Sequence, residues 1–104
     1  MAELKIVYWN DIPGQVVIRE GGRSTRLRLS PRFMKAIERA SYRLKKKDKN
    51  AVFDPWHAVD QPFKGDVREQ AKILVIQLEE QYSEAILDIL IRASGKDESR
   101  ILNS

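Results

Sequence analysis

The chain has 104 residues, of which 42% are hydrophobic and 33% are charged, and its formal net charge is +4. This length fits one domain with a single modest core, and the composition is typical of a folded globular protein rather than a disordered one. The absence of cysteine excludes a disulfide framework, a cysteine nucleophile and a thiolate metal site. We expect one domain over residues 1–95, followed by a polar tail over residues 96–104.

The charges are distributed unevenly along the chain. Residues 1–50 carry 13 Lys and Arg against 5 Asp and Glu, whereas residues 51–104 carry 6 against 10. Such an asymmetry can indicate an anionic partner, but we prefer the interpretation that the helices simply expose solvated charges. The longest apolar run, residues 73–76, is far shorter than the ~20 residues of a membrane span, and we expect a cytoplasmic protein.

The first strand is predicted over residues 4–9, where hydrophobic and polar positions alternate. Strict alternation puts Leu4, Ile6 and Tyr8 on one face and Trp9 on the opposite face. Helices that cover only one side of the sheet would therefore leave Tyr8 or Trp9 at least partly exposed.

Two further strands follow. Pro13-Gly14 predicts a type II turn, because proline presets φ at the first central position and glycine tolerates the positive φ of the second. A second strand is predicted over residues 15–20, and Gly21-Gly22 predicts a tight hairpin into a third strand over residues 24–29. In this third strand Arg26 and Arg28 alternate with core positions, so one of its faces is cationic.

Helices are predicted for the remainder of the chain. Ser30 as N-cap and Pro31 at the first helical position predict a helix that ends near Lys45-Lys46-Lys47. Its sheet-facing side is predicted to comprise Phe33, Ile37, Ala40, Ser41 and Leu44. Residues 48–65 are irregular, with at most a short turn around residues 56–58. Asp66 predicts the start of the last helical stretch, which is either one helix over residues 67–93 or two, the second capped by Ser83, with Gly95 as terminator.

These elements predict an α+β fold: a three-stranded antiparallel sheet followed by two or three helices packed on one face. No serine lies in a nucleophile-elbow pattern, and no glycine-rich phosphate loop is present. His57 is the single histidine, and we interpret it as a packed or surface residue rather than a metal ligand. Glu79-Glu80 is interpreted as a solvated helix face. We therefore expect a protein that is not an enzyme and that holds no metal and no cofactor.

Two features point to binding. Trp9 and Trp56 either anchor loops to the core, as tryptophan usually does, or contribute to a recognition surface. Arginines on an uncovered sheet face resemble a single-strand nucleic-acid platform in outline, but aromatic residues are not interleaved with them. A protein partner and a nucleic-acid partner are both possible on these grounds.

The segment Val7-Tyr8-Trp9-Asn10-Asp11-Ile12-Pro13-Gly14-Gln15-Val16-Val17 resembles the opening motif of the small bacterial "virulence factor" family. Members of this family also form the C-terminal part of the larger protein conserved virulence factor C. The resemblance continues through residues 29–33 and 36–37 and, more weakly, into the last helical stretch. Asn10 stands where the family pattern has a basic residue, and Ser30 precedes Pro31 where the family has leucine. The resemblance implies a small α+β interaction module, and it implies an association with corrinoid- and folate-dependent methyl transfer.

We therefore predict a non-catalytic accessory or protein-interaction module whose partner is another protein, with no membrane involved. The predicted partner-binding residues are Tyr8, Trp9, Asp11, Gln15, Arg26 and Arg28. The alternative is a nucleic-acid-binding module that uses an arginine-rich sheet face. The additional residues predicted for this alternative are Arg19, Arg23, Lys45, Lys46, Lys47 and Lys49.

Overall fold

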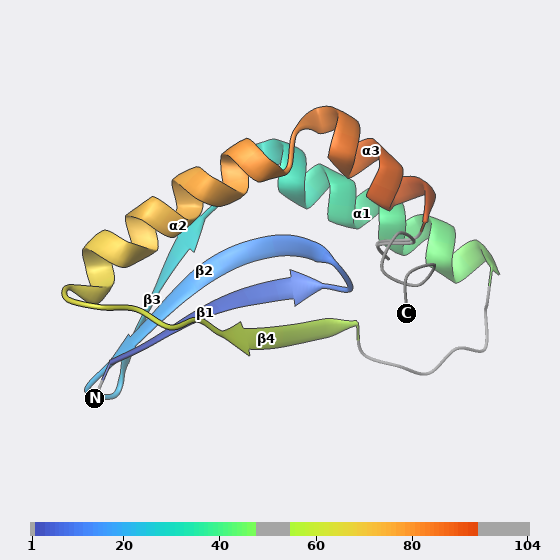
Figure 1. Cartoon of the computed structure of the whole chain (residues 1–104). Coiled ribbons are helices and arrows are strands. Elements are labelled where there is room, and N and C mark those ends of the chain that lie inside the picture. Colours follow the sequence, from blue (N-terminus) through green and yellow to red (C-terminus); the bar gives the residue numbers. More distant parts are fainter. Residues whose placement is uncertain (1, 48–54, 94–104) are drawn as a thin grey trace, which may run out of the picture.

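The computed structural model describes residues 2–47 and 55–93 of the chain. The described residues form four strands and three helices: β1 (Ala2–Trp9), β2 (Ile12–Glu20), β3 (Arg23–Arg28), α1 (Pro31–Lys47), β4 (Trp56–Asp60), α2 (Val67–Gln81) and α3 (Glu84–Arg92). The helices form one layer over the sheet, and no helix of the described residues lies on the opposite face (Figure 1). The α+β class and the one-sided helical layer are as predicted. The expected tail over residues 96–104 and the expected terminator Gly95 lie outside the described residues.

The sheet has four strands in the order β3-β2-β1-β4, all antiparallel, and the prediction of three strands was wrong. The additional strand, β4, occupies the region that was predicted to be irregular with a short turn. It lies between Pro55 and Pro62, which prevent a longer regular element, and it becomes a strand by pairing with β1. A five-residue segment carries little local signal, so its conformation depends on that long-range pairing.

The predicted turn at Pro13-Gly14 was also wrong. The chain reverses two residues earlier, at Asn10 and Asp11, and Asn10 adopts the positive φ of 51° that a two-residue hairpin loop requires. Pro13 and Gly14 belong to β2 instead. The register between β1 and β2 shifts between Val7 and Tyr8, because Gly14 is an extra residue on β2.

Gly14 is needed for space rather than for a positive φ. A Cβ atom at this position would lie 3.2 Å from Cζ3 of Trp56 and 3.4 Å from Cδ1 of Ile37. The glycine therefore lets β4 and α1 both pack closely against the bulge.

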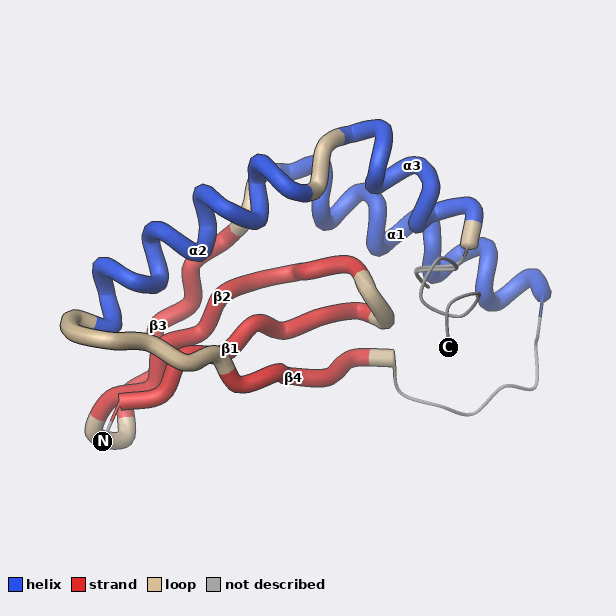
Figure 2. The backbone as a smooth tube through the Cα atoms, viewed as in Figure 1, coloured by secondary structure: helices blue, strands red, loops and turns tan. Residues whose placement is uncertain are grey.

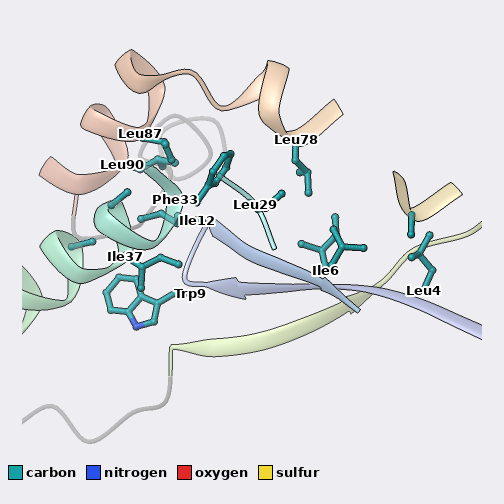
Figure 3. Close-up of a cluster of buried hydrophobic side chains, with 14 of the residues drawn as sticks. Leu4, Ile6, Trp9, Ile12, Leu29, Phe33, Ile37, Leu78, Leu87 and Leu90 are labelled. Atoms are coloured by element: carbon teal, nitrogen blue, oxygen red, sulfur yellow. The ribbon is translucent and has the colours of Figure 1, made fainter. Parts of the chain in front are cut away.

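The same bulge corrects the predicted facing of Trp9. Strict alternation placed Trp9 away from the core. In the structure Trp9 is only 4% exposed, and Figure 3 shows its indole beside Ile37 of α1. A bulge increases the local twist and changes the direction of the side chains that follow it. Tyr8 is the half-buried residue of the pair, in agreement with the expectation that one of the two would be partly exposed.

The helices begin and end close to their predicted positions. α1 begins at Pro31, and the structure gives two helices after residue 66, as the Ser83 alternative predicted. Asp66 caps α2 by accepting the N–H of Arg68 at 3.0 Å, and the Ser83 hydroxyl caps α3 by accepting the N–H of Ile86 at 3.3 Å.

The core lies between the sheet and the helical layer. α2 packs over β1, β2 and β3, whereas α1 packs over β2 and against α3 (Figure 2). Among the residues predicted to face the sheet from α1, Phe33, Ile37 and Ala40 are buried, and Ser41 and Leu44 are half-buried. β4 lies beyond this cover, and all five of its residues are exposed.

Candidate interaction surface

The strand register places three arginines on the face of the sheet that the helices leave uncovered. Buried Val16 and Ile18 point into the core, so Val17 between them points to the other face, where it pairs with Arg26. Two residues before Val17, Gln15 pairs with Arg28, and two residues after it, Arg19 pairs with Ser24. We call Gln15, Arg19, Arg26 and Arg28 together the arginine face.

The three arginines of this face are exposed, and none of them forms an ion pair with another described residue. The nearby cation on β1 behaves differently, because Lys5 Nζ lies 3.6 Å from Asp60 and 3.9 Å from Glu3. Arg19, Arg26 and Arg28 therefore have no salt bridge to a described residue, although Glu3 of β1 lies opposite Arg19, whereas Lys5 is paired with Asp60 of β4. Such a surface attracts an anionic group with little loss of existing interactions.

The arginine face also includes apolar area. Val17 of β2 and Val7 of β1 point to the same side as the arginines, and both are half-buried. Apolar positions between cations give a surface on which a protein partner can exclude water as well as form charge pairs. The prediction that one face of β3 is cationic is consistent with this register.

The predicted partner-binding residues separate into two groups. Gln15, Arg26 and Arg28 lie together on the arginine face. Asp11 is half-buried in the loop between β1 and β2. Tyr8 stacks on His57 of β4, with ring centroids 5.6 Å apart and planes 15° apart, so one face of its ring is already covered. Trp9 belongs to the core, so almost none of its surface is accessible to a partner in the predicted role of aromatic anchor.

The residues of the nucleic-acid alternative do not form one surface either. Arg19 lies on the arginine face, whereas Arg23 starts β3 at the hairpin opposite Glu20. Lys45 is exposed on α1, and α1 belongs to the layer on the other side of the sheet. The side chains of Lys46 and Lys47, and the whole of Lys49, lie outside the described residues.

A half-buried polar cluster, which was not predicted from the sequence, joins the start of α1 to α2. Glu79 accepts hydrogen bonds from the backbone N–H of Ser30 at 2.7 Å and from its hydroxyl at 2.6 Å. Arg32 lies 2.8 Å from the same carboxylate and donates to the carbonyls of Glu79 at 2.7 Å and Tyr82 at 3.1 Å. We call these four residues the Ser30–Arg32–Glu79–Tyr82 clamp. Glu79 was interpreted as a solvated residue, but only 27% of its side chain is exposed.

The charge of Glu79 is stabilised within this clamp. Partial burial raises the pKa of the carboxyl, but the hydrogen bonds from Ser30 and the neighbouring Arg32 guanidinium outweigh it, so the pKa lies below the ordinary value of 4.5. Arg32 also lies over the ring of Phe33, 4.8 Å from its centroid. The segment 30–33 therefore fixes the junction of α2 and α3 against the start of α1.

Small-ligand chemistry has limited support in the described part of the chain. A shallow groove of about 330 Å³ between α1 and α3 has Lys35 and Arg39 on one side and Glu84 and Asp88 on the other, all exposed. Over residues 2–47 and 55–93, no three His, Asp or Glu side chains gather closely enough to hold a metal ion. None of the described helices is long and apolar enough to cross a membrane.

A comparison with known protein families finds one match. The description of this family is "Virulence factor", and its sequence pattern covers residues 7–91 of the chain. The chain belongs to the virulence factor family. No significant match is found among curated proteins or among solved structures.

The span shared with the virulence factor family runs from the second half of β1 into α3. It therefore contains both the arginine face and the clamp. In this member of the family, the segment 29–33 that carried the resemblance supplies Ser30 and Arg32 of the clamp, and the segment 7–17 forms the hairpin loop and the bulge. Both motif segments consequently have a structural explanation.

Proposed function

We propose that this virulence factor family protein is a non-catalytic, cytoplasmic interaction module that docks an acidic protein surface onto the arginine face. The observation that carries this proposal is the group of exposed guanidinium groups on β2 and β3, none of which is paired with a described carboxylate. Arginine is well suited to such a surface, because its planar fork binds carboxylates through two parallel hydrogen bonds.

A protein partner is favoured over a nucleic acid by the side chains between the arginines. Single-stranded nucleic acids bind to sheet faces by stacking bases on aromatic rings, and each stacked base contributes roughly 1–3 kcal/mol. The positions of β2 and β3 on the arginine face hold Gln15, Val17 and Ser24 besides the arginines, and none of these is aromatic. Val17 and Val7 instead supply the apolar contact area that a protein interface uses.

The family resemblance also suggests a pathway. An accessory subunit associated with corrinoid- or folate-dependent methyl transfer would use such a face to contact a larger acidic protein. The proposal does not require the module to hold the cofactor itself.

The test is affinity capture from a lysate of the native bacterium with three tagged proteins: the wild type, Arg26→Glu/Arg28→Glu and Lys35→Glu/Arg39→Glu. Both double variants lower the net charge by the same amount, but Lys35 and Arg39 lie on α1, away from the arginine face. We expect a discrete protein to be captured by the wild type and the α1 variant and lost with the β3 variant. Equal capture by all three would contradict the proposal, and capture that nuclease abolishes would favour nucleic acid.

A further inference from the structure

β4 is an outer strand of the sheet with no described segment beyond it (Figure 1). The hydrogen bonds at its two ends show which of its backbone groups already have partners. The N–H of Gln61 donates to the Leu4 carbonyl at 2.8 Å, and the Pro55 carbonyl accepts from the N–H of Asn10 at 2.9 Å. Positions 55 and 61 therefore direct their backbone groups toward β1.

In an antiparallel strand, the direction of the backbone N–H and C=O alternates from one residue to the next. Positions 57 and 59 consequently face β1 as positions 55 and 61 do, whereas Ala58 and Asp60 direct their N–H and C=O to the outer side. Ala58 is the central residue of β4. The next residue, Val59, is 41% exposed. This outer side is a template for one more strand.

The two edges of the sheet differ in how they are protected. β3 has three arginines among its six residues, and pairing it with another β3 would bring like charges together. β4 contains no lysine, arginine or proline, and its register with β1 has no bulge. Its one charged residue is Asp60, at its end. β3 is therefore protected by charge, whereas within β4 no Lys, Arg, Pro or bulge opposes pairing, and only its shortness and the flanking Pro55 and Pro62 limit it.

We propose that β4 is a self-association edge, at which two copies of this chain pair their β4 strands antiparallel about a two-fold axis at Ala58. In this register Ala58 faces Ala58 of the second copy, and Asp60 faces Trp56 of the second copy, so no like charges meet. His57 faces Val59 of the second copy, which covers part of the exposed apolar surface.

The charge pattern explains why a second copy is the occupant and why association stops at two. The paired sheets form one continuous sheet whose outer strands are the two β3 strands, and both of these carry arginines. A symmetric pair is thus closed, with no unprotected edge left to extend it. A five-residue strand gives a small interface compared with the roughly 800 Å² per partner of stable complexes, so we expect half-dimerisation at a concentration on the order of 100 µM.

Sedimentation equilibrium over a concentration series is the first test. Wild-type protein should shift from monomer toward dimer up to about 1 mM, and Ala58→Pro should weaken dimerisation by more than about tenfold. Proline at this position removes an outward N–H but none of the hydrogen bonds to β1, so the melting temperature should change little. Ala58→Thr, which keeps the N–H and has a higher strand propensity, is the matched control and should dimerise at least as well as wild type.

A charge exchange tests the two-fold register without relying on proline. Ala58→Lys and Ala58→Glu should each weaken self-association about fivefold, because two like charges then face each other across the axis. An equimolar mixture of the two variants should restore dimers at least to the wild-type level. The mixture should restore dimers only if residue 58 of one copy faces residue 58 of the other.

Three results would overturn the proposal. Wild-type protein that stays monomeric at about 1 mM would show that the edge does not pair with itself and takes a strand from another protein or none. Dimerisation that Ala58→Pro leaves unchanged in a folded protein would place the interface elsewhere. A mixture of the lysine and glutamate variants that associates no better than either variant alone would reject the register.

Discussion

Removing Arg32 should destabilise the protein more than the loss of any other described cation. Its guanidinium lies 2.8 Å from the Glu79 carboxylate and donates to the backbone carbonyls of Glu79 and Tyr82 at 2.7 and 3.1 Å. The ion pair is partly exposed and contributes up to about 1 kcal/mol, and each charge-assisted hydrogen bond contributes about 1 kcal/mol after discount for solvent. We expect Arg32→Ala to lower the free energy of unfolding by about 2–3 kcal/mol.

The assay is urea unfolding followed by circular dichroism. In thermal unfolding, a loss of about 2–3 kcal/mol should lower the melting temperature by about 10 °C in a domain of this length. Arg32→Lys is the control, because it keeps the charge but not the fork that reaches carbonyl and carboxylate together, and it should recover less than half of the loss. A double-mutant cycle with Glu79→Gln should give a coupling energy of about 1 kcal/mol.

The pH dependence of the same cycle tests the electrostatic part of the reasoning. The pKa of Glu79 is lower in the folded protein than the ordinary value of 4.5, because the hydrogen bonds of Ser30 and the charge of Arg32 outweigh the effect of burial. The stabilisation is therefore complete above about pH 4.5 and is lost as the pH falls through the folded-state pKa. The difference in stability between wild type and Glu79→Gln should be constant from pH 7 to pH 5 and should shrink below pH 4.5. A difference that stays the same at pH 3, or a cost of Arg32→Ala below about 0.5 kcal/mol, would refute the clamp as a source of stability.

Three further substitutions test the packing. Gly14→Ala should cost about 1–3 kcal/mol and change the fluorescence of Trp56, because the new Cβ would lie 3.2 Å from its ring; an unchanged spectrum and stability would contradict the close approach. Trp9→Ala should cost about 3–5 kcal/mol in chemical denaturation, as for other buried aromatics, and a cost below about 1 kcal/mol would be inconsistent with a core position. Ser83→Ala should cost about 1 kcal/mol in thermal unfolding through loss of the α3 cap, whereas Ser83→Asp should retain most of the stability.

Sequence patterns predicted the elements that are determined locally. The hairpin at Gly21-Gly22, the start of α1 at Pro31 and the caps at Asp66 and Ser83 each depend on a side chain or backbone preference within a few residues. The choice between one and two helices after residue 66 was left open for a physical reason. The apolar stripe continues through the junction, and only the Ser83 cap distinguishes the two possibilities.

The elements that were mispredicted depend on distant partners. β4 becomes a strand because its backbone pairs with β1. Trp9 enters the core because Gly14 adds a bulge on the neighbouring strand. Pro13-Gly14 has the composition of a type II turn, but Asn10 reverses the chain first, and the glycine is required by Trp56 and Ile37 instead. None of these contacts leaves a local signal in the sequence.

The candidate surface was predicted only where strand alternation determines it. Arg26 and Arg28 follow period two along β3, so their common face could be inferred, whereas Gln15 joins them through a register that the sequence does not specify. The grouping with Tyr8, Trp9 and Asp11 came from closeness in the sequence, and the bulge separates that group from the arginines. The family motif also contributed to this grouping, because its unusual aromatic and charged residues were interpreted as a binding site. Such residues can equally be required by the fold. In this chain, residues 30 and 32 connect α1 to α2, and Gly14 allows α1 and β4 to pack against the hairpin. Arg19, Arg26 and Arg28, where we propose that a partner docks, lie outside both motif segments.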